Sequence, residues 1–174
     1  YGKILPAEIL SIPPQGTLEA GYPEEGSAFD YFFENDISIS NYGEIVGSRN
    51  VGLDINYPGI AYSYEPDIDK ARYVEGRITD DCHLSSFNYV LLPNDHTLGL
   101  SAGEPTPRSM IADNDEGVGR VVHALSHSSF WPNSVIFIIE DDPQNGGDHV
   151  DNHRAPFVVV SPWVRRGYVS SVHY

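Results

Sequence analysis

Two short apolar runs near the C-terminus constrain the fold of this chain more than any other feature. They are Val135–Ile139 and Phe157–Val160, both rich in β-branched residues and without the alternation of a half-exposed strand. Such runs are typical of strands buried on both faces of a parallel sheet. Parallel strands need helices as crossovers, so the chain is predicted to have an α/β fold.

Earlier segments contain a second set of helix and strand signals. Ser27 precedes a short amphipathic helix that is expected to end by Asn35–Asp36. Residues 37–46 begin with the alternation of a strand, and residues 87–92 form another apolar run typical of a buried strand. A helix followed by a strand is the unit from which α/β domains are built.

A longer helix is expected between the strand at 87–92 and the run at Val135. Asp113 with Glu116 three residues later forms a capping-box pattern, and the helix is predicted to continue to about His127. The order strand, polar loop, helix, strand predicts a mostly parallel sheet with right-handed connections.

The remaining segments contain few periodic signals. At 174 residues the chain has the length of a single domain, so residues 1–174 are predicted to form one. Residues 1–26, rich in proline and glycine, are expected to be an irregular N-terminal segment. Residues 47–83 are expected to be a long loop-rich excursion.

Polar side chains follow two of the predicted strands. Asp95 and His96 come directly after the strand at 87–92, and the loop after Ile139 is rich in carboxylates and imidazoles. The members of that loop are Glu140, Asp141, Asp142, Asp148, His149, Asp151 and His153. Ligands of open α/β sheets bind beyond the carboxyl ends of the strands, and carboxylate oxygens and imidazole nitrogens bind divalent metals. The sequence therefore predicts a metal-dependent site, provided that the two strands are neighbours in the sheet.

Several alternatives stay open at this point. A Ca²⁺ site would use carboxylates alone, and the interleaved histidines favour a different metal. Arg154 could bind phosphate through its fork of donors. His123 and His127 are one helical turn apart but lack the glutamate of a zinc-protease motif, and an exposed helix face is the favoured interpretation. Thr97, Ser101 and Ser161 lack an activating context for a nucleophile.

Charge and composition exclude some classes of partner. The formal net charge is −15, which argues against nucleic acid or an anionic membrane surface. No apolar run is long enough to cross a bilayer. A single cysteine, Cys82, rules out an internal disulfide.

Three segments carry a resemblance to a known family. They are LLPNDHT, TPRSMIADNDEGVGRVVHALSHSSFW and VIFIIEDDPQNGGDHVDNHRAPFVVVSPWVRRG. Over roughly Pro23 to Tyr174 the chain resembles the C-terminal half of the phosphoesterase family, which includes bacterial phospholipase C and acid phosphatases and belongs to the alkaline phosphatase superfamily. It is most similar to the form fused behind a YncE-like β-propeller. The resemblance implies an α/β/α sandwich and metal-dependent hydrolysis of phosphate esters outside the cytoplasm, in the periplasm or the extracellular space.

The resemblance also implies roles for individual residues. The expected metal ligands are Asp95, Asp141, Asp142, His149 and His153, and the metal is expected to be Zn, Mn or Ca. The catalytic groups that the resemblance implies are His96 and His149. Arg154, chosen for its fork of donors, is expected to act with them on the phosphate-ester substrate.

The chain also departs from the family pattern. Nothing before Pro23 matches the family's first strand, which carries a metal ligand and is followed by a Ser or Thr nucleophile. The chain is therefore expected to be an incomplete domain, inactive alone and completed by an N-terminal segment or a fused β-propeller. The alternative is a degenerate, non-catalytic module with a metal-binding, structural or assembly role. The oligomeric state stays open.

Overall fold

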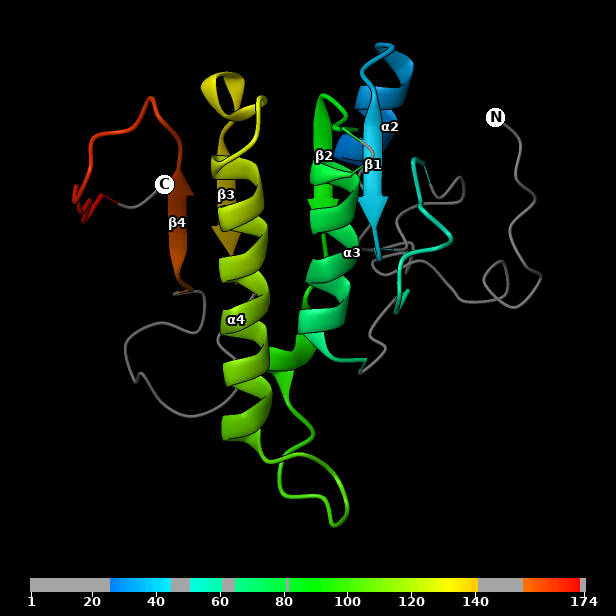
Figure 1. Cartoon of the computed structure of the whole chain (residues 1–174), viewed down its shortest axis with the longest axis vertical. Helices are drawn as coiled ribbons and strands as arrows, with labels where there is room; N and C mark the ends of the chain where they lie inside the picture. Colours follow the sequence, from blue (N-terminus) through cyan, green and yellow to red (C-terminus); the bar gives the residue numbers. More distant parts are fainter. Residues whose placement is uncertain (1–25, 45–50, 61–64, 81, 141–154, 173–174) are drawn as a thin grey trace. The chain divides into compact units, whose positions relative to one another are not determined.

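The computed structural model describes residues 26–44, 51–60, 65–80, 82–140 and 155–172 (Figure 1). Contacts divide the chain into two compact units, Tyr1–Val121 and Val122–Tyr174. The single domain expected from the chain length stays a prediction. The predicted N-terminal segment 1–26 lies almost entirely outside the described residues.

A parallel pair of strands lies at the centre of the first unit. β1 (Ile39–Tyr42) and β2 (Phe87–Val90) pair with Ile39 opposite Phe87 and Tyr42 opposite Val90. Leu53 adds an isolated parallel bridge to Asn41. These strands confirm an α/β architecture with a small parallel sheet, and both fall inside the segments predicted to be strands.

Helix α2 (Ala28–Glu34) begins where the sequence predicted. The Ser27 hydroxyl accepts a hydrogen bond from the Asp30 backbone N–H at 3.2 Å, and the Asp30 carboxylate accepts one from the Ser27 N–H at 2.9 Å. This reciprocal capping box satisfies two backbone donors that the helix itself cannot pair. Phe29 is buried and packs edge-on against the rings of Phe87 and Tyr89, which attaches α2 to the sheet.

Helix α3 (Asp67–Thr79) lies inside the segment 47–83, where a loop-rich excursion was expected. That prediction is wrong for these residues. Ala71, Val74 and Ile78 are spaced by three and four residues and form a buried stripe. The charged residues between them made the stripe hard to recognise in the sequence.

The two short helices pack on opposite faces of the sheet. Tyr73 of α3 contacts Tyr42 of β1, with ring centroids 6.3 Å apart. Tyr42 pairs with Val90, and side chains alternate along a strand, so Tyr42 and Tyr89 point to opposite faces. Since α2 contacts Tyr89, helices cover both faces of the parallel pair.

Helix α4 (Pro107–Ser126) begins seven residues earlier than predicted, because the capping-box pattern with Asp113 as N-cap would start the helix at Asn114. The Thr106 hydroxyl accepts a hydrogen bond from the Ser109 backbone N–H at 3.2 Å. Proline at the first helical position suits the helix because its missing N–H would be unpaired there anyway. Asp113 therefore lies in the interior of α4 and cannot cap it.

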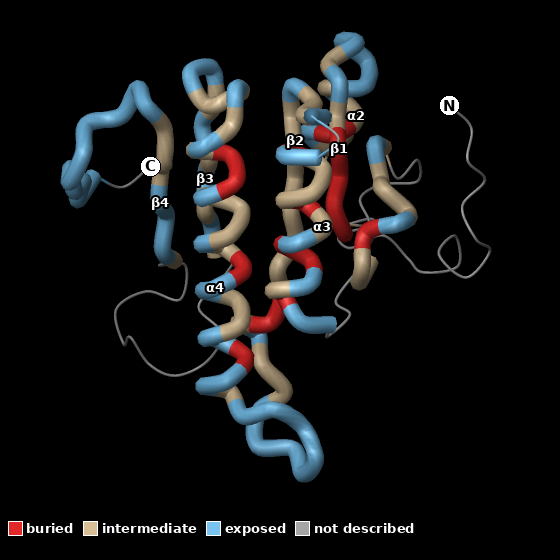
Figure 2. The backbone as a smooth tube through the Cα atoms, in the orientation of Figure 1, coloured by how far each residue is buried: buried red, intermediate tan, exposed pale blue. Residues whose placement is uncertain are grey.

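The second unit contains η2 (Trp131–Asn133) and the strands β3 (Ile136–Ile139) and β4 (Phe157–Val160). Both strands lie where the sequence predicted, but they pair antiparallel, with Ile136 opposite Val160 and Ile139 opposite Phe157. The prediction that both are strands of a parallel sheet, buried on both faces, is wrong. Phe137 and Ile139 are 57% and 66% exposed, and no residue of either strand is buried (Figure 2).

Within the described ranges, no helix combines the length and the apolar character needed to cross a membrane.

Candidate functional site

The residues directly beyond the carboxyl end of β2 form the candidate site. β2 ends at Val90, and the 3₁₀ helix η1 (Pro93–His96) follows it with proline at its start. Asp95 is half-buried, and His96 is exposed. The His96 Nδ1 atom lies 3.3 Å from the Thr97 carbonyl oxygen. The structure thus places Asp95 and His96 at the end of a parallel strand, as their positions in the sequence predicted.

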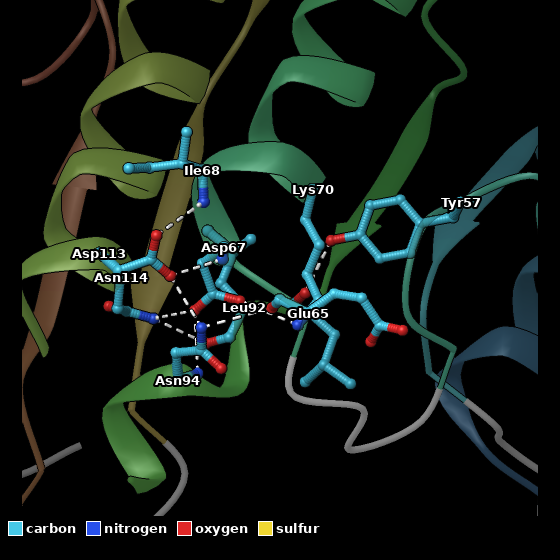
Figure 3. A network of polar contacts seen from close by, with 10 residues as sticks. Tyr57, Glu65, Asp67, Ile68, Lys70, Leu92, Asn94, Asp113 and Asn114 are labelled. Atoms are coloured by element: carbon cyan, nitrogen blue, oxygen red, sulfur yellow. Dashed lines mark hydrogen bonds and ion pairs between the residues drawn. The ribbon is translucent and has the colours of Figure 1, made fainter. Parts of the chain in front are cut away.

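A buried polar network holds η1 in place, and the Asp67 carboxylate lies at its centre (Figure 3). One carboxylate oxygen accepts a hydrogen bond from Lys70 Nζ at 3.0 Å. The other accepts from the Asn94 backbone N–H at 2.9 Å and from Asn114 Nδ2 at 3.0 Å. Asp67 and Lys70 have no exposed surface, so this ion pair lies entirely inside the protein. Buried charges are tolerated when they are paired and hydrogen-bonded, as these are.

Asp113 of α4 caps the N-terminus of α3 from a neighbouring helix. Its carboxylate accepts hydrogen bonds from the backbone N–H groups of Asp67 at 2.6 Å and Ile68 at 3.4 Å. The same carboxylate accepts from Asn94 Nδ2 at 2.7 Å. A negative charge at a helix N-terminus interacts favourably with the helix dipole. One side chain therefore connects α4, α3 and η1.

The two asparagines complete the network through backbone carbonyls. Asn94 Nδ2 donates to the Glu65 carbonyl at 3.3 Å, and Asn114 Nδ2 donates to the Leu92 carbonyl at 2.7 Å. Leu92 lies between β2 and η1, where the regular hydrogen bonds of the strand have ended. The Asn114 amide therefore supplies the donor that its carbonyl needs. These bonds orient the peptide that leads into Asp95 and His96.

A glycine allows the helices to approach closely at this point. A Cβ atom at Gly117 of α4 would lie 3.0 Å from the Asp67 carbonyl oxygen. Such a distance is shorter than ordinary van der Waals contact, so any larger residue would push α4 away from the start of α3. The absence of a side chain at Gly117 is what allows Asp113 to reach the α3 N–H groups.

Two tyrosines lie beside the network in the first unit. The Tyr57 hydroxyl donates to the Leu91 carbonyl at 2.8 Å, and burial raises the pKa of Tyr57 above its ordinary range. The Tyr73 hydroxyl donates to the Asp54 carboxylate at 2.8 Å. Burial and then this hydrogen bond raise the pKa of Tyr73 to about 12. Both tyrosines therefore stay neutral near pH 7, and their role is to pack and to donate.

The other residues predicted for the site lie outside the described residues. They are Asp141, Asp142, His149, His153 and Arg154. Glu140, at the end of β3, is described and half-buried, and its N–H donates to the Pro156 carbonyl at 3.4 Å. Among the residues that the structure describes, no three carboxylate, imidazole or thiol side chains come together as a metal site. The predicted metal set therefore stays a prediction.

Sequence reasoning missed the network that supports the site. In the DND run at 113–115, Asp113 was predicted to cap only its own helix. Asp67 and Lys70 are three residues apart, which is compatible with an ordinary exposed ion pair on a helix. The asparagine of PNDH was a usable signal, because asparagine pairs readily with backbone groups where a strand ends.

Comparison of the chain with protein-family models, with curated proteins and with solved structures found no match.

Proposed function

We propose that this chain is part of a metal-dependent enzyme that hydrolyses phosphate esters, to which it contributes metal and phosphate ligands. The observation that carries the proposal is the position of Asp95 and His96 beyond the carboxyl end of β2, next to a buried network that hydrogen-bonds to Asn94. This edge is where α/β sheets bind their ligands. The resemblance of the surrounding segments to the phosphoesterase family supplies the reaction class.

The side chains proposed to bind the metal are carboxylates and imidazoles. They are Asp95, Asp141, Asp142, His149 and His153, and such a mixed set suits Zn, Mn or Ca to different degrees. A bound divalent ion polarises a phosphoryl oxygen and stabilises the leaving group.

Residues of this chain would complete the reaction site. His96 and His149 are proposed to contact the phosphate or its leaving group, and Arg154 is proposed to orient it through paired hydrogen bonds. No residue of the chain is assigned as nucleophile. The proposal includes a complete α/β/α sandwich and a location outside the cytoplasm, in the periplasm or the extracellular space.

Hydrolysis of a phosphate monoester and a phosphate diester by the full-length protein tests the proposal. Activity should disappear on chelation and return with Zn²⁺, Mn²⁺ or Ca²⁺. Replacing Asp141 and Asp142 together by alanine should lower kcat/KM by at least about a hundredfold, since metal charge supplies several kcal/mol of transition-state stabilisation. Asp69 and Asp115 are exposed carboxylates of α3 and α4, so D69A/D115A is a matched control that should retain full activity.

The His96→Ala variant tests the residue that the structure places at the strand end. It should lower kcat/KM while leaving the unfolding midpoint unchanged, because His96 is exposed. Undiminished activity in D141A/D142A would reject the assignment of the metal ligands. An intact protein that binds no divalent metal by elemental analysis would instead favour the non-catalytic module.

A further inference from the structure

Two histidines at the C-terminal end of α4 form a pair that the proposed function does not use: His123 lies in its last turn, and His127 directly follows Ser126, the last residue of the helix. His123 and His127 lie one helical turn apart, both belong to the second unit and both are exposed. Their imidazole rings are stacked, with centroids 4.2 Å apart and planes inclined by 24°. Residues four apart on a helix lie on the same face, so the two side chains can act on one ligand.

The hydrogen bonds of His127 determine which of its ring nitrogens is available. Its Nδ1 atom lies 2.9 Å from the His123 carbonyl oxygen, which can only accept. Nδ1 therefore carries the proton, and the neutral ring keeps its lone pair on Nε2. Ser126 Oγ also donates to this carbonyl, at 3.1 Å. Histidines that bind metals commonly donate their second N–H to a backbone carbonyl in this way, because the bond orients the ring.

We propose that His123 and His127 form a two-imidazole binding site for a divalent transition metal at the C-terminal end of α4. Imidazole nitrogens bind Cu²⁺, Ni²⁺ and Zn²⁺, and the general order of affinities makes Cu²⁺ the tightest of the three. Ca²⁺ and Mg²⁺ prefer oxygen ligands and do not bind here. The sequence lacks the glutamate that a zinc protease places between its histidines, so the site binds metal without hydrolytic chemistry.

The pair is expected to bind a metal ion more tightly than two separate histidines, because the helical turn holds the two rings close together. Once one imidazole holds the ion, the other is already within reach, so the second bond forms at a high effective concentration. The net charge of −15 adds a general attraction for cations. The site uses none of the residues assigned to phosphoester hydrolysis, and it stands independently of that proposal.

Titration of the ¹⁵N-labelled full chain with Cu²⁺, followed by NMR, tests the site. The paramagnetic ion should broaden the amide signals of residues around His123 and His127 at low Cu²⁺ concentrations. H123Q and H127Q should each weaken this effect on the order of a hundredfold, because each removes half of the chelate. Glutamine is a good helix former, and both positions are exposed, so both variants should fold.

Control variants separate this site from other histidines. His83 is exposed and distant in sequence, so H83Q should leave the broadening at α4 unchanged. D141A/D142A should also leave it unchanged, even if it abolishes hydrolysis. Electron paramagnetic resonance of the Cu²⁺ complex of the wild type should show two coordinating nitrogens. Broadening that persists in H123Q and H127Q, or coordination by oxygen alone, would overturn the proposal.

Discussion

At the scale of single residues, the most unusual feature is a lysine with no exposed surface. Lys70 forms its ion pair with Asp67, which itself accepts bonds from the Asn94 backbone and the Asn114 side chain. A charge buried in this way costs several kcal/mol of desolvation, which only good geometry and further hydrogen bonds offset. The network therefore gives a unique geometry to the start of α3 and to η1.

We expect Lys70→Met to destabilise the protein strongly. Methionine fills a similar volume but leaves the Asp67 carboxylate buried without its cation, which costs about 3–5 kcal/mol. The Arg72–Asp69 pair of the same helix has the same spacing, but its side chains are 58% and 52% exposed. R72M should therefore cost about 0–1 kcal/mol. Urea unfolding of both variants measures the difference, and equal losses would contradict the assigned role of burial.

We expect the stabilisation that Tyr73 contributes to be lost at high pH. The pKa of Tyr73 is raised to about 12 in the folded state, whereas an unfolded tyrosine titrates near about 10. The folded state keeps the proton longer, so the stabilisation is complete below about pH 10 and is lost as the pH rises toward about 12. Unfolding midpoints measured from pH 8 upward should fall less steeply in Tyr73→Phe. The exposed Tyr31 offers a control, and a Y31F profile as flat as that of Y73F would argue against this cause.

At the scale of elements, the contact between α3 and α4 organises the first unit. Asp113 caps α3 only because α4 comes close to Asp67 at Gly117. Each helix is thus stabilised by the other at the same point, and η1 is attached to both through Asn94. This contact therefore also fixes the position of the candidate site residues Asp95 and His96, which belong to η1.

Two glycines of α4 provide a matched test of the close approach. Alanine at Gly119 meets no atom within 4 Å and should stabilise the protein by about 0.5–1 kcal/mol through helix propensity. Alanine at Gly117 would meet the Asp67 backbone, which its hydrogen bonds hold in place. We expect G117A to destabilise by about 1–2 kcal/mol despite the same gain in propensity. Thermal unfolding of both variants measures this, and stabilisation by G117A would show that α4 can shift away without loss.

At the scale of the whole molecule, the dominant property is a net charge of −15. Like charges repel one another more when the chain is compact. The apolar side chains on β3 and β4 add exposed hydrophobic surface in the second unit. A net negative charge attracts cations in general, and the absence of nucleic-acid binding stays a prediction.

We expect salt to stabilise the protein. Raising NaCl from about 10 mM to about 500 mM shortens the screening length from about 30 Å to below 10 Å and weakens the repulsion. A gain of about 1 kcal/mol would raise Tm by about 2–4 °C for a chain of this size. Differential scanning calorimetry measures the shift, and D69N/D115N, with two fewer exposed charges, should shift less. A Tm that falls with NaCl would mean that exposed ion pairs outweigh the net repulsion.

Local chemistry was enough to locate several elements. The Ser27 capping signal places the start of α2, and runs of apolar residues place β2, β3 and β4, because caps and strand propensities act over a few neighbouring residues. The position of Asp95 and His96 at a strand end follows from the same short-range pattern. The remaining candidate ligands lie outside the described residues, so their convergence on this end stays a prediction.

Long-range contacts decided the rest. An apolar run does not encode the direction of its partner, so the antiparallel pairing of β3 with β4 depends on backbone hydrogen bonds between distant segments. The sequence predicts Asp113 to be the cap of its own helix, yet Asp113 caps α3. Only the packing at Gly117 brings Asp113 to the N-terminus of α3. The burial of Lys70 likewise depends on which surfaces meet. Composition and periodicity describe a residue and its neighbours along the chain, whereas charge burial and strand direction arise from neighbours in space.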